Sequence, residues 1–394
     1  MKKAITKIDN FGRGITYIND KICFVDNSLE GEEVDVDIYK ETSKYSLANP
    51  ISISNHSLDR IEAECPLSSI CGGCQCNHMS YQKELNWKID KVKDIFKRIA
   101  NIELDNININ SLNRNHYRNK ITLHGNNQKL GYYSKDNKDI IPINNCLISN
   151  NKINKLLPVI NKNKNLKEVV IKTNNNEKEV MISIEGEVNN IEELKSQSDV
   201  LIINKKLLTN KNDIINKIGK YKYYEKIDSF FQINEELTEI LYDKVKESLN
   251  DTYNNGLDLY CGTGTIGIYI SDKIKKIIGV DNNKANIDEA IKNKDLNKIN
   301  NIDFICNKVE NVIDKFKNID IVIVDPPRSG LDKKTIKYLK EINPKKIIYI
   351  SCDPITQARD INLLKDNYKL IDLELFNMFP RTYHCESISV LERK

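Results

Sequence analysis

From about residue 226 onward, the chain alternates short apolar segments with longer amphipathic ones, and this alternation constrains the fold most strongly. The apolar segments, which we expect to be strands, occupy residues 256–260, 276–280, 302–306, 319–324 and 345–350. Strands that alternate with helices form a parallel sheet, because each helix returns the chain to the same edge. The sequence therefore predicts an α/β, Rossmann-like doubly wound sheet over residues 226–394.

A glycine-rich turn follows the first of these strands. Gly262, Gly264 and Gly267 have Gly-x-Gly-x-x-Gly spacing between a strand and a helix, which lets a ligand lie close to the backbone at the helix N-terminus. Asp281 follows the next strand, where a carboxylate can accept hydrogen bonds from ribose hydroxyls. These features fit a dinucleotide and S-adenosylmethionine equally well.

Two later strand ends favour a methyltransferase over a dehydrogenase. The strand 319–324 is followed by Asp325, two prolines and Arg328, and the strand 345–350 is followed by Ser351 and Cys352. Because ligands of open α/β sheets bind beyond the carboxyl ends of the strands, Gly262, Asp281, Asp325 and Cys352 should converge on one edge. A dehydrogenase needs no cysteine there, whereas methylation of an unreactive pyrimidine carbon does.

Methylation of uracil carbon 5 requires a nucleophile and a base. Addition of a thiolate at carbon 6 makes carbon 5 electron-rich, and a base must later remove the carbon-5 proton so that the cysteine is expelled. Cys352 is the predicted nucleophile and Glu386 the predicted base. If the last strand, 387–391, runs antiparallel as edge strands often do, Glu386 lies beside the other strand ends, and His384 can face the same pocket.

Several cysteines before residue 150 have the spacing of a metal or cluster site. Cys71 and Cys74 form a C-x-x-C unit, Cys65 precedes it, and Cys76 and Cys146 follow. Four soft ligands of this kind suit either zinc or an iron–sulfur cluster, and spacing alone does not separate the two. A disulfide is not expected, because the chain has the character of a cytoplasmic protein.

The sequence before residue 226 predicts two further structural parts, a small β-barrel and an α+β segment. Short apolar patches at 15–18, 22–25 and 34–38 are separated by turn residues, which favours a small β-barrel. Residues 81–100 have helical apolar spacing, and this helix could pack on the catalytic domain. Residues 115–225 are mixed α+β, with a hairpin formed by 169–172 and 179–184.

Together these features resemble the cluster-containing RNA uracil-5 methyltransferases, close to the bacterial 23S ribosomal RNA enzymes. The resemblance covers nearly the whole chain and implies a TRAM domain, an OB-like RNA-binding barrel, over residues 1–58. It further implies a central α+β domain over 59–225 and a methyltransferase domain over 226–394. By the same resemblance, a [4Fe–4S] cluster is expected in place of zinc, and its four ligands are Cys65, Cys71, Cys74 and Cys146.

The resemblance also implies the residues of the methyltransferase site. Cys352 matches the nucleophile and Glu386 the base of this family. With the glycine-rich turn included, the residues expected to bind S-adenosylmethionine are Gln232, Tyr260, Gly262, Thr265, Asp281 and Asp325.

We therefore expect a cytoplasmic, monomeric enzyme that methylates carbon 5 of uridine in 23S ribosomal RNA. The same chemistry on transfer RNA and a non-catalytic RNA-binding module with a vestigial methyltransferase fold remain as alternatives. A net charge of only +4, from 60 Lys+Arg and 56 Asp+Glu, excludes a histone-like polycation and leaves room for a local basic groove. The sequence has no run of 18 apolar residues, so no membrane span is expected.

Overall fold

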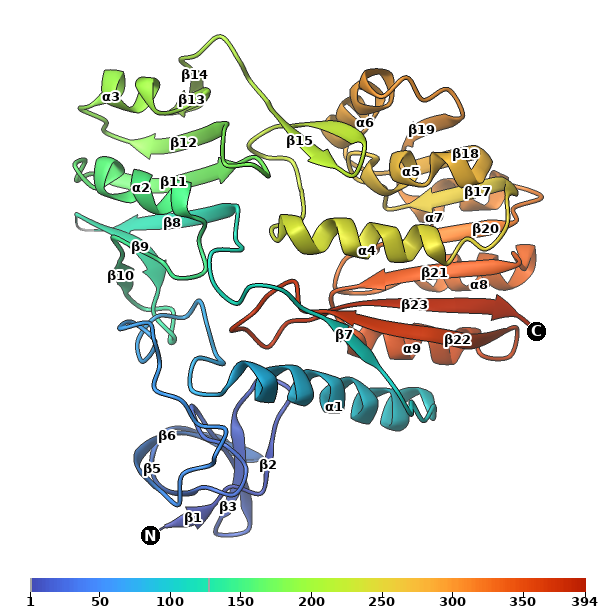
Figure 1. Ribbon diagram of the computed structural model, residues 1–394. Helices are drawn as coiled ribbons and strands as arrows, with labels where there is room; N and C mark the ends of the chain where they lie inside the picture. The colour runs from blue at the N-terminus through green and yellow to red at the C-terminus, as the bar shows by residue number, and fades with distance from the viewer. Residues whose placement is uncertain (1, 127) are drawn as a thin grey trace.

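The computed structural model describes residues 2–126 and 128–394. Figure 1 shows a small N-terminal β-structure at the bottom, a second sheet at the upper left and a larger α/β part on the right. The long helix α1 (Tyr81–Ala100) lies between the first and the last of these. Its bounds are those predicted from the sequence; the Ser80 hydroxyl caps its N-terminus by accepting a hydrogen bond from the Lys83 N–H.

The N-terminal part is a six-stranded sheet that curls around a small core formed by Ile5, Cys23, Val25, Val34 and Ala48. The prediction of short N-terminal strands is confirmed, and the sequence missed the strand that contains Pro50. A proline is tolerated there because it lies beside a bulge in the pairing of β5 and β6. The strands, in sheet order, are β1 (Lys3–Ala4), β5 (Glu33–Glu41), β6 (Tyr45–Ser54), β4 (Lys21–Val25), β3 (Gly14–Ile18) and β2 (Lys7–Ile8).

The central part is a seven-stranded sheet packed against α2 (Asn151–Ile160) and α3 (Ile191–Ser196). Its order is β10 (Ile140–Pro142), β9 (Lys129–Tyr133), β8 (Lys120–Asn126), β11 (Leu166–Thr173), β12 (Val180–Gly186), β13 (Val200–Ile203) and β14 (Lys206–Leu207). The predicted hairpin is confirmed, because β11 and β12 pair antiparallel. A separate hairpin of β15 (Ile214–Ile218) and β16 (Tyr221–Glu225) leads to the last part.

The C-terminal part contains an eight-stranded sheet, and the predicted doubly wound α/β fold is confirmed. The final strand does run antiparallel, but it is not the edge strand: β22 and β7 continue the sheet beyond it. The sheet order is β19 (Ile302–Cys306), β18 (Ile274–Asp281), β17 (Tyr253–Leu259), β20 (Ile321–Val324), β21 (Lys346–Ser351), β23 (Glu386–Arg393), β22 (Tyr368–Phe376) and β7 (Asn108–Asn110). The sheet thus includes a strand from outside residues 226–394.

Helices cover both faces of this sheet, and β20 shows how the sequence achieves this. Its four residues are all buried, with Ile321 and Ile323 packed on one face and Val322 and Val324 on the other. The valine face is covered by α1, α7 (Val309–Val312), α8 (Lys333–Ile342) and α9 (Pro354–Leu364). The isoleucine face is covered by α4 (Glu235–Glu247) and α5 (Thr265–Tyr269), and α6 (Lys284–Leu296) packs near β18 and β19.

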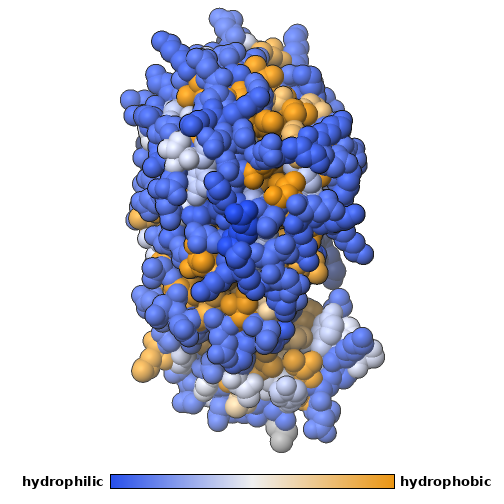
Figure 2. Space-filling view, turned by 90° about the vertical axis from the view of Figure 1, so that its right-hand side faces the viewer, coloured by the Kyte–Doolittle hydropathy of each residue, from blue (hydrophilic) through white to orange (hydrophobic). Residues whose placement is uncertain are grey.

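Figure 2 shows one face of the molecule, on which hydrophilic residues predominate and apolar residues form separate small patches. Within residues 2–126 and 128–394, no helix combines the length and the apolar character that a membrane span requires.

Candidate active site

A pocket of about 830 Å³ lies at the carboxyl ends of the parallel strands of the C-terminal sheet. Its walls come from the ends of β17, β18, β20 and β21, from the start of β23 and from the loops around them. The strand order reverses between β17 and β20, so the pocket opens at the topological switch point, where doubly wound folds bind ligands. The residues predicted from the sequence that line it are Gln232, Tyr260, Gly262, Asp281, Asp325, Cys352, His384 and Glu386.

The glycine-rich turn holds the carboxylate of Asp281 at the pocket wall. Gly262 N–H donates a hydrogen bond of 3.1 Å to Asp281 Oδ2, and Asn283 N–H donates one of 2.8 Å to Oδ1. Tyr260 and Gly262 have φ angles of 63° and 53°, so the chain turns back sharply after β17. A Cβ atom on Gly262 would meet nothing within 4 Å, so this backbone faces open space suited to a ligand.

Thr265 differs from the other residues expected to bind the cofactor, because it does not line this pocket. It begins α5, and its hydroxyl lies 2.8 Å from the hydroxyl of buried Tyr242. Its carbonyl accepts a hydrogen bond from the hydroxyl of Tyr223. The side chain of Thr265 is therefore used to fix α5 on its neighbours.

The two residues with predicted catalytic roles share the pocket with a second carboxyl group. Burial raises the pKa of Glu386 well above its ordinary value, and the nearby charge of Asp325 raises it further. Burial also raises the pKa of Asp325, to about 7. The pKa of the Cys352 thiol rises to about 11, first through burial and then through the charges of Glu386 and Asp325. The pocket therefore favours the neutral forms of all three groups.

Arg328 lowers the pKa values that burial and the carboxyl groups raise. Its guanidinium hydrogen-bonds the thiol and lowers the pKa of Cys352, and its charge also lowers the pKa of Glu386. Arg328 Nη2 lies 3.3 Å from His384 Nε2, and burial together with this positive charge lowers the pKa of His384 to about 4. His384 is therefore neutral at physiological pH. Sequence reasoning assigned no role to Arg328, although its place shortly after the end of β20 was a signal that could have identified it.

A second pocket, of about 280 Å³, brings the four predicted cluster cysteines together. Cys65, Cys71, Cys74 and Cys146 all line it, whereas Cys76 is buried in a separate apolar cluster with Trp87. Burial and the neighbouring cysteines raise the pKa of Cys74 to about 12, and the charge of Arg381 lowers it. The thiols surround the pocket, and in the part of the chain that the structure describes no three His, Cys, Asp or Glu side chains form a single-ion site.

Comparisons with known proteins match both ends of the chain. Residues 80–394 match the family model described as tRNA (Uracil-5-)-methyltransferase, and residues 4–51 match the TRAM domain. A protein of Clostridium tetani (strain Massachusetts / E88) named as an uncharacterized RNA methyltransferase is 32% identical, covering 98% of this chain and 95% of its own. A protein of the same description from Caldanaerobacter subterraneus subsp. tengcongensis is 35% identical, covering 99% and 97%.

A solved structure also matches along the whole chain. It is the Pyrococcus abyssi tRNA (uracil-54, C5)-methyltransferase in complex with S-adenosyl-L-homocysteine. The two chains are 24% identical, and the match has a TM-score of 0.82 over 99% of this chain and 100% of the other. The two proteins therefore share the complete three-part fold.

Proposed function

Because this chain belongs to the tRNA (uracil-5-)-methyltransferase family, an S-adenosylmethionine-dependent RNA-modifying family, we propose that it methylates carbon 5 of a uridine in 23S ribosomal RNA. The observation that carries the proposal is one pocket that contains a thiol, a buried carboxyl group and a glycine-rich turn. The thiol is Cys352 and the carboxyl group is Glu386, which are the two groups that this chemistry requires.

In the proposed reaction, Cys352 Sγ forms a bond to carbon 6 of uracil, and the electron pair of the ring double bond moves toward carbon 5. Carbon 5 would then take the methyl group that S-adenosylmethionine supplies, and the sulfonium sulfur would keep the electron pair of the broken sulfur–methyl bond. Glu386 in its ionised form, which the positive charge of Arg328 favours, takes the carbon-5 proton. The carbon 5–carbon 6 double bond then returns, and the bond from Sγ to carbon 6 breaks. Arg328 supports the first step, because a cation beside Sγ stabilises the thiolate that attacks.

The pocket offers the groups that would hold S-adenosylmethionine, which supplies an electrophilic methyl group when bound. The Asp281 carboxylate is oriented by backbone N–H groups and can accept hydrogen bonds from the ribose hydroxyls. Gln232, Tyr260 and Asp325 line the same wall, and Gly262 leaves the backbone open to close approach. A positively charged sulfonium bound beside Asp325 would lower the pKa of this carboxyl group and favour its ionised form.

We further propose that the cysteine pocket holds a [4Fe–4S] cluster through Cys65, Cys71, Cys74 and Cys146. The four thiols line one pocket, and thiolates are the ligands that such clusters prefer. Methyl transfer involves no change of oxidation state, so we assign the cluster a role in holding the surrounding segments and shaping the RNA-binding surface.

Two classes of RNA are candidate substrates. The resemblance to cluster-containing enzymes favours ribosomal RNA, whereas the family description and the Pyrococcus abyssi neighbour both refer to transfer RNA. In either RNA, a uridine in a folded structure must leave its stack to reach Cys352. The TRAM segment is the part of the chain that we propose to hold the flanking RNA.

A deletion strain separates these candidates. Ribosomal and transfer RNA from the strain and its parent are digested with nuclease, and the fragment masses are compared for the loss of one methyl group on uridine. Loss in a 23S fragment, restored by the wild-type gene and not by Cys352→Ser, supports the proposal. Loss in a transfer RNA fragment would replace the proposed substrate, and unchanged fragments from both RNAs would refute the proposed activity.

A further inference from the structure

The loop at residues 377–385 connects β22 to β23 and carries the pocket residues Phe379 and His384 directly before Glu386. Segments distant in the sequence fix its backbone. Lys88 Nζ donates to the Phe379 carbonyl, Tyr117 hydroxyl to the Pro380 carbonyl, and Lys91 Nζ to the Tyr383 carbonyl. The position of the proposed base therefore depends on residues from α1 and the central part of the chain.

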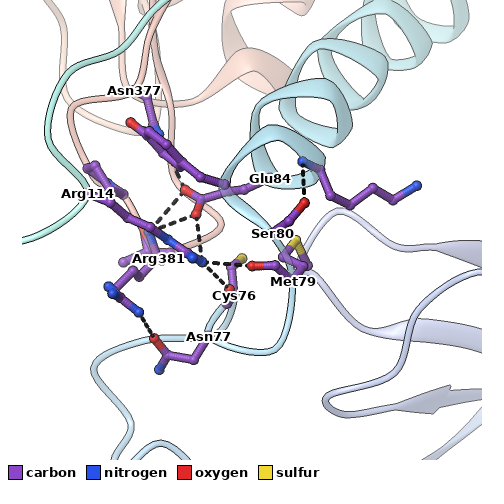
Figure 3. Close-up of polar contacts among 12 residues, drawn as sticks. Cys76, Asn77, Met79, Ser80, Glu84, Arg114, Asn377 and Arg381 are labelled. Carbon is purple, nitrogen blue, oxygen red and sulfur yellow. Dashed lines mark hydrogen bonds and ion pairs between the residues drawn. The ribbon is translucent and has the colours of Figure 1, made fainter. Parts of the chain in front are cut away.

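Arg381 lies at the centre of this loop and is buried. Its side chain is 1% exposed, although arginine is seldom buried. Its φ angle is 68°, a left-handed conformation that a non-glycine residue adopts only when its surroundings enforce it. Figure 3 shows its backbone beside Glu84 of α1, whose two carboxylate oxygens accept the Arg381 N–H at 3.0 and 3.2 Å.

The other contacts of Arg381 lead to the cysteine pocket. Its carbonyl accepts hydrogen bonds of 2.9 Å from both Gln75 N–H and Cys76 N–H, directly after Cys74. Its guanidinium donates to Asn77 Oδ1 at 2.9 Å and to Glu64 Oε2 at 2.8 Å. These partners flank the segment with three of the four pocket cysteines, and Arg381 itself lines that pocket.

Asn115 completes the set of partners, because its side-chain oxygen accepts hydrogen bonds from Arg381 Nε and Nη2. Each of the three guanidinium nitrogens therefore has an acceptor. A lysine at this position would keep the charge but lack the planar fork that reaches Asn77, Glu64 and Asn115 together. The site is specific for arginine on geometric grounds.

We propose that Arg381 is a positioning residue that transmits the arrangement of the cysteine pocket to Glu386. This inference rests on the proposed function and adds a residue to it. When the cysteine segment is correctly held, Arg381 fixes the loop and sets the Glu386 carboxylate against the carbon-5 proton. When that segment loosens, the loop loses its anchors. Proton removal and expulsion of Cys352 then slow, whereas the earlier bond between Sγ and carbon 6 still forms.

The first test separates these two steps with Arg381→Lys. Adduct formation is followed with RNA containing 5-fluorouridine, in which fluorine replaces the carbon-5 proton and blocks the base-dependent step. We expect formation within about twofold of wild type, because the loop does not carry Cys352. On uridine RNA, we expect turnover to fall roughly tenfold or more, with accumulation of the methylated covalent complex, since a small displacement of a catalytic group has effects of this size.

Arg60→Lys is the matched control. Arg60 forms a similar ion pair with buried Glu32, but it contacts neither the 377–385 loop nor the cysteines. It should leave both rates unchanged. Parallel loss of adduct formation and turnover in Arg381→Lys would indicate a general structural role and refute the proposal, as would unchanged turnover. If the wild type itself formed no adduct, the proposed function would fail instead.

Amide hydrogen exchange gives a readout that is independent of activity. In Arg381→Lys, we expect faster exchange at the amides of Gln75, Cys76 and Arg381, which form the hydrogen bonds described above. Cys74→Ser, which alters the cysteine pocket alone, should accelerate exchange in the same loop. Unchanged exchange of residues 377–385 in Cys74→Ser would refute the coupling.

A second variant covers the case in which Arg381→Lys does not fold. Glu64→Gln removes one charged partner of Arg381 at a side chain that is 50% exposed, so folding should be preserved. We expect the same selective loss of turnover, smaller than in Arg381→Lys. Equal rates in Glu64→Gln and wild type would then refute the proposal.

Discussion

Replacement of Arg328 by glutamine removes the positive charge that contacts the thiol of Cys352. In the wild type, the pKa of this thiol is about 11 because burial and two carboxyl groups outweigh Arg328. At pH 8, a thiol with this pKa is ionised in roughly one molecule in a thousand. Since Arg328 lowers the pKa, its loss must raise it, and the thiolate becomes rarer at every pH below the pKa.

The size of the effect follows from the position of Arg328. It hydrogen-bonds the thiol but its side chain is exposed, so solvent and salt screen part of its charge. We therefore take the loss of Arg328 to raise the pKa of Cys352 by about one unit, which is the lower end of the range for an adjacent opposite charge. The rate of thiolate reactions at Cys352 should therefore fall about tenfold between pH 7 and 9, and the difference should shrink above the pKa.

Alkylation by iodoacetamide measures this directly. The protein is alkylated at a series of pH values, and the peptide containing Cys352 is quantified by mass spectrometry. Arg393→Gln is the matched control, because it removes an arginine at the far end of β23. A profile for Arg328→Gln that coincides with that of the wild type, or that moves to lower pH, would contradict the reasoning.

Three further predictions follow from other contacts. Glu386→Gln should form the covalent RNA complex but release it slowly, and gel analysis under denaturing conditions checks this; release at the wild-type rate would exclude Glu386 as the base. Phe96→Ala should lower the free energy of unfolding by about 3–5 kcal/mol in urea titrations, because Phe96 is fully buried where α1 meets the sheet. Burial raises the pKa of Asp258 from 3.8 to about 7, so this group favours folding most at low pH and loses that effect as the pH rises from about 4 to 7. Asp258→Asn should flatten this part of the stability profile, and an unchanged slope would contradict the assignment.

Local sequence patterns predicted the parallel strands well, because buried strands appear as apolar runs bounded by turns. The segment 302–306 coincides with β19, and the other predicted strands lie within a few residues of the observed ones. The strands β22 and β7 were missed. The strand β22 alternates polar and apolar residues, and β7 consists mainly of asparagine. In addition, β7 joins the sheet only through a pairing with residues far along the chain.

For the candidate active site, too, local sequence patterns were informative and contacts between distant residues were not. Strand ends identified Asp325 and Cys352 as neighbours, because parallel strands share a carboxyl edge. Sequence could not indicate that the hydroxyl of Thr265 is used by Tyr242, because that contact comes from α4. It also could not indicate that Arg381 joins the loop before Glu386 to the cysteine segment, because those residues are some 300 positions apart.

The most direct measurement of the central claim is peptide mapping of the covalent complex. The wild-type protein is incubated with S-adenosylmethionine and RNA containing 5-fluorouridine, digested, and analysed by mass spectrometry. The account predicts a methylated fluorouridine attached to the peptide containing Cys352, and no complex with Cys352→Ser. Attachment at another cysteine, or methylation of uridine RNA by Cys352→Ser at the wild-type rate, would contradict it.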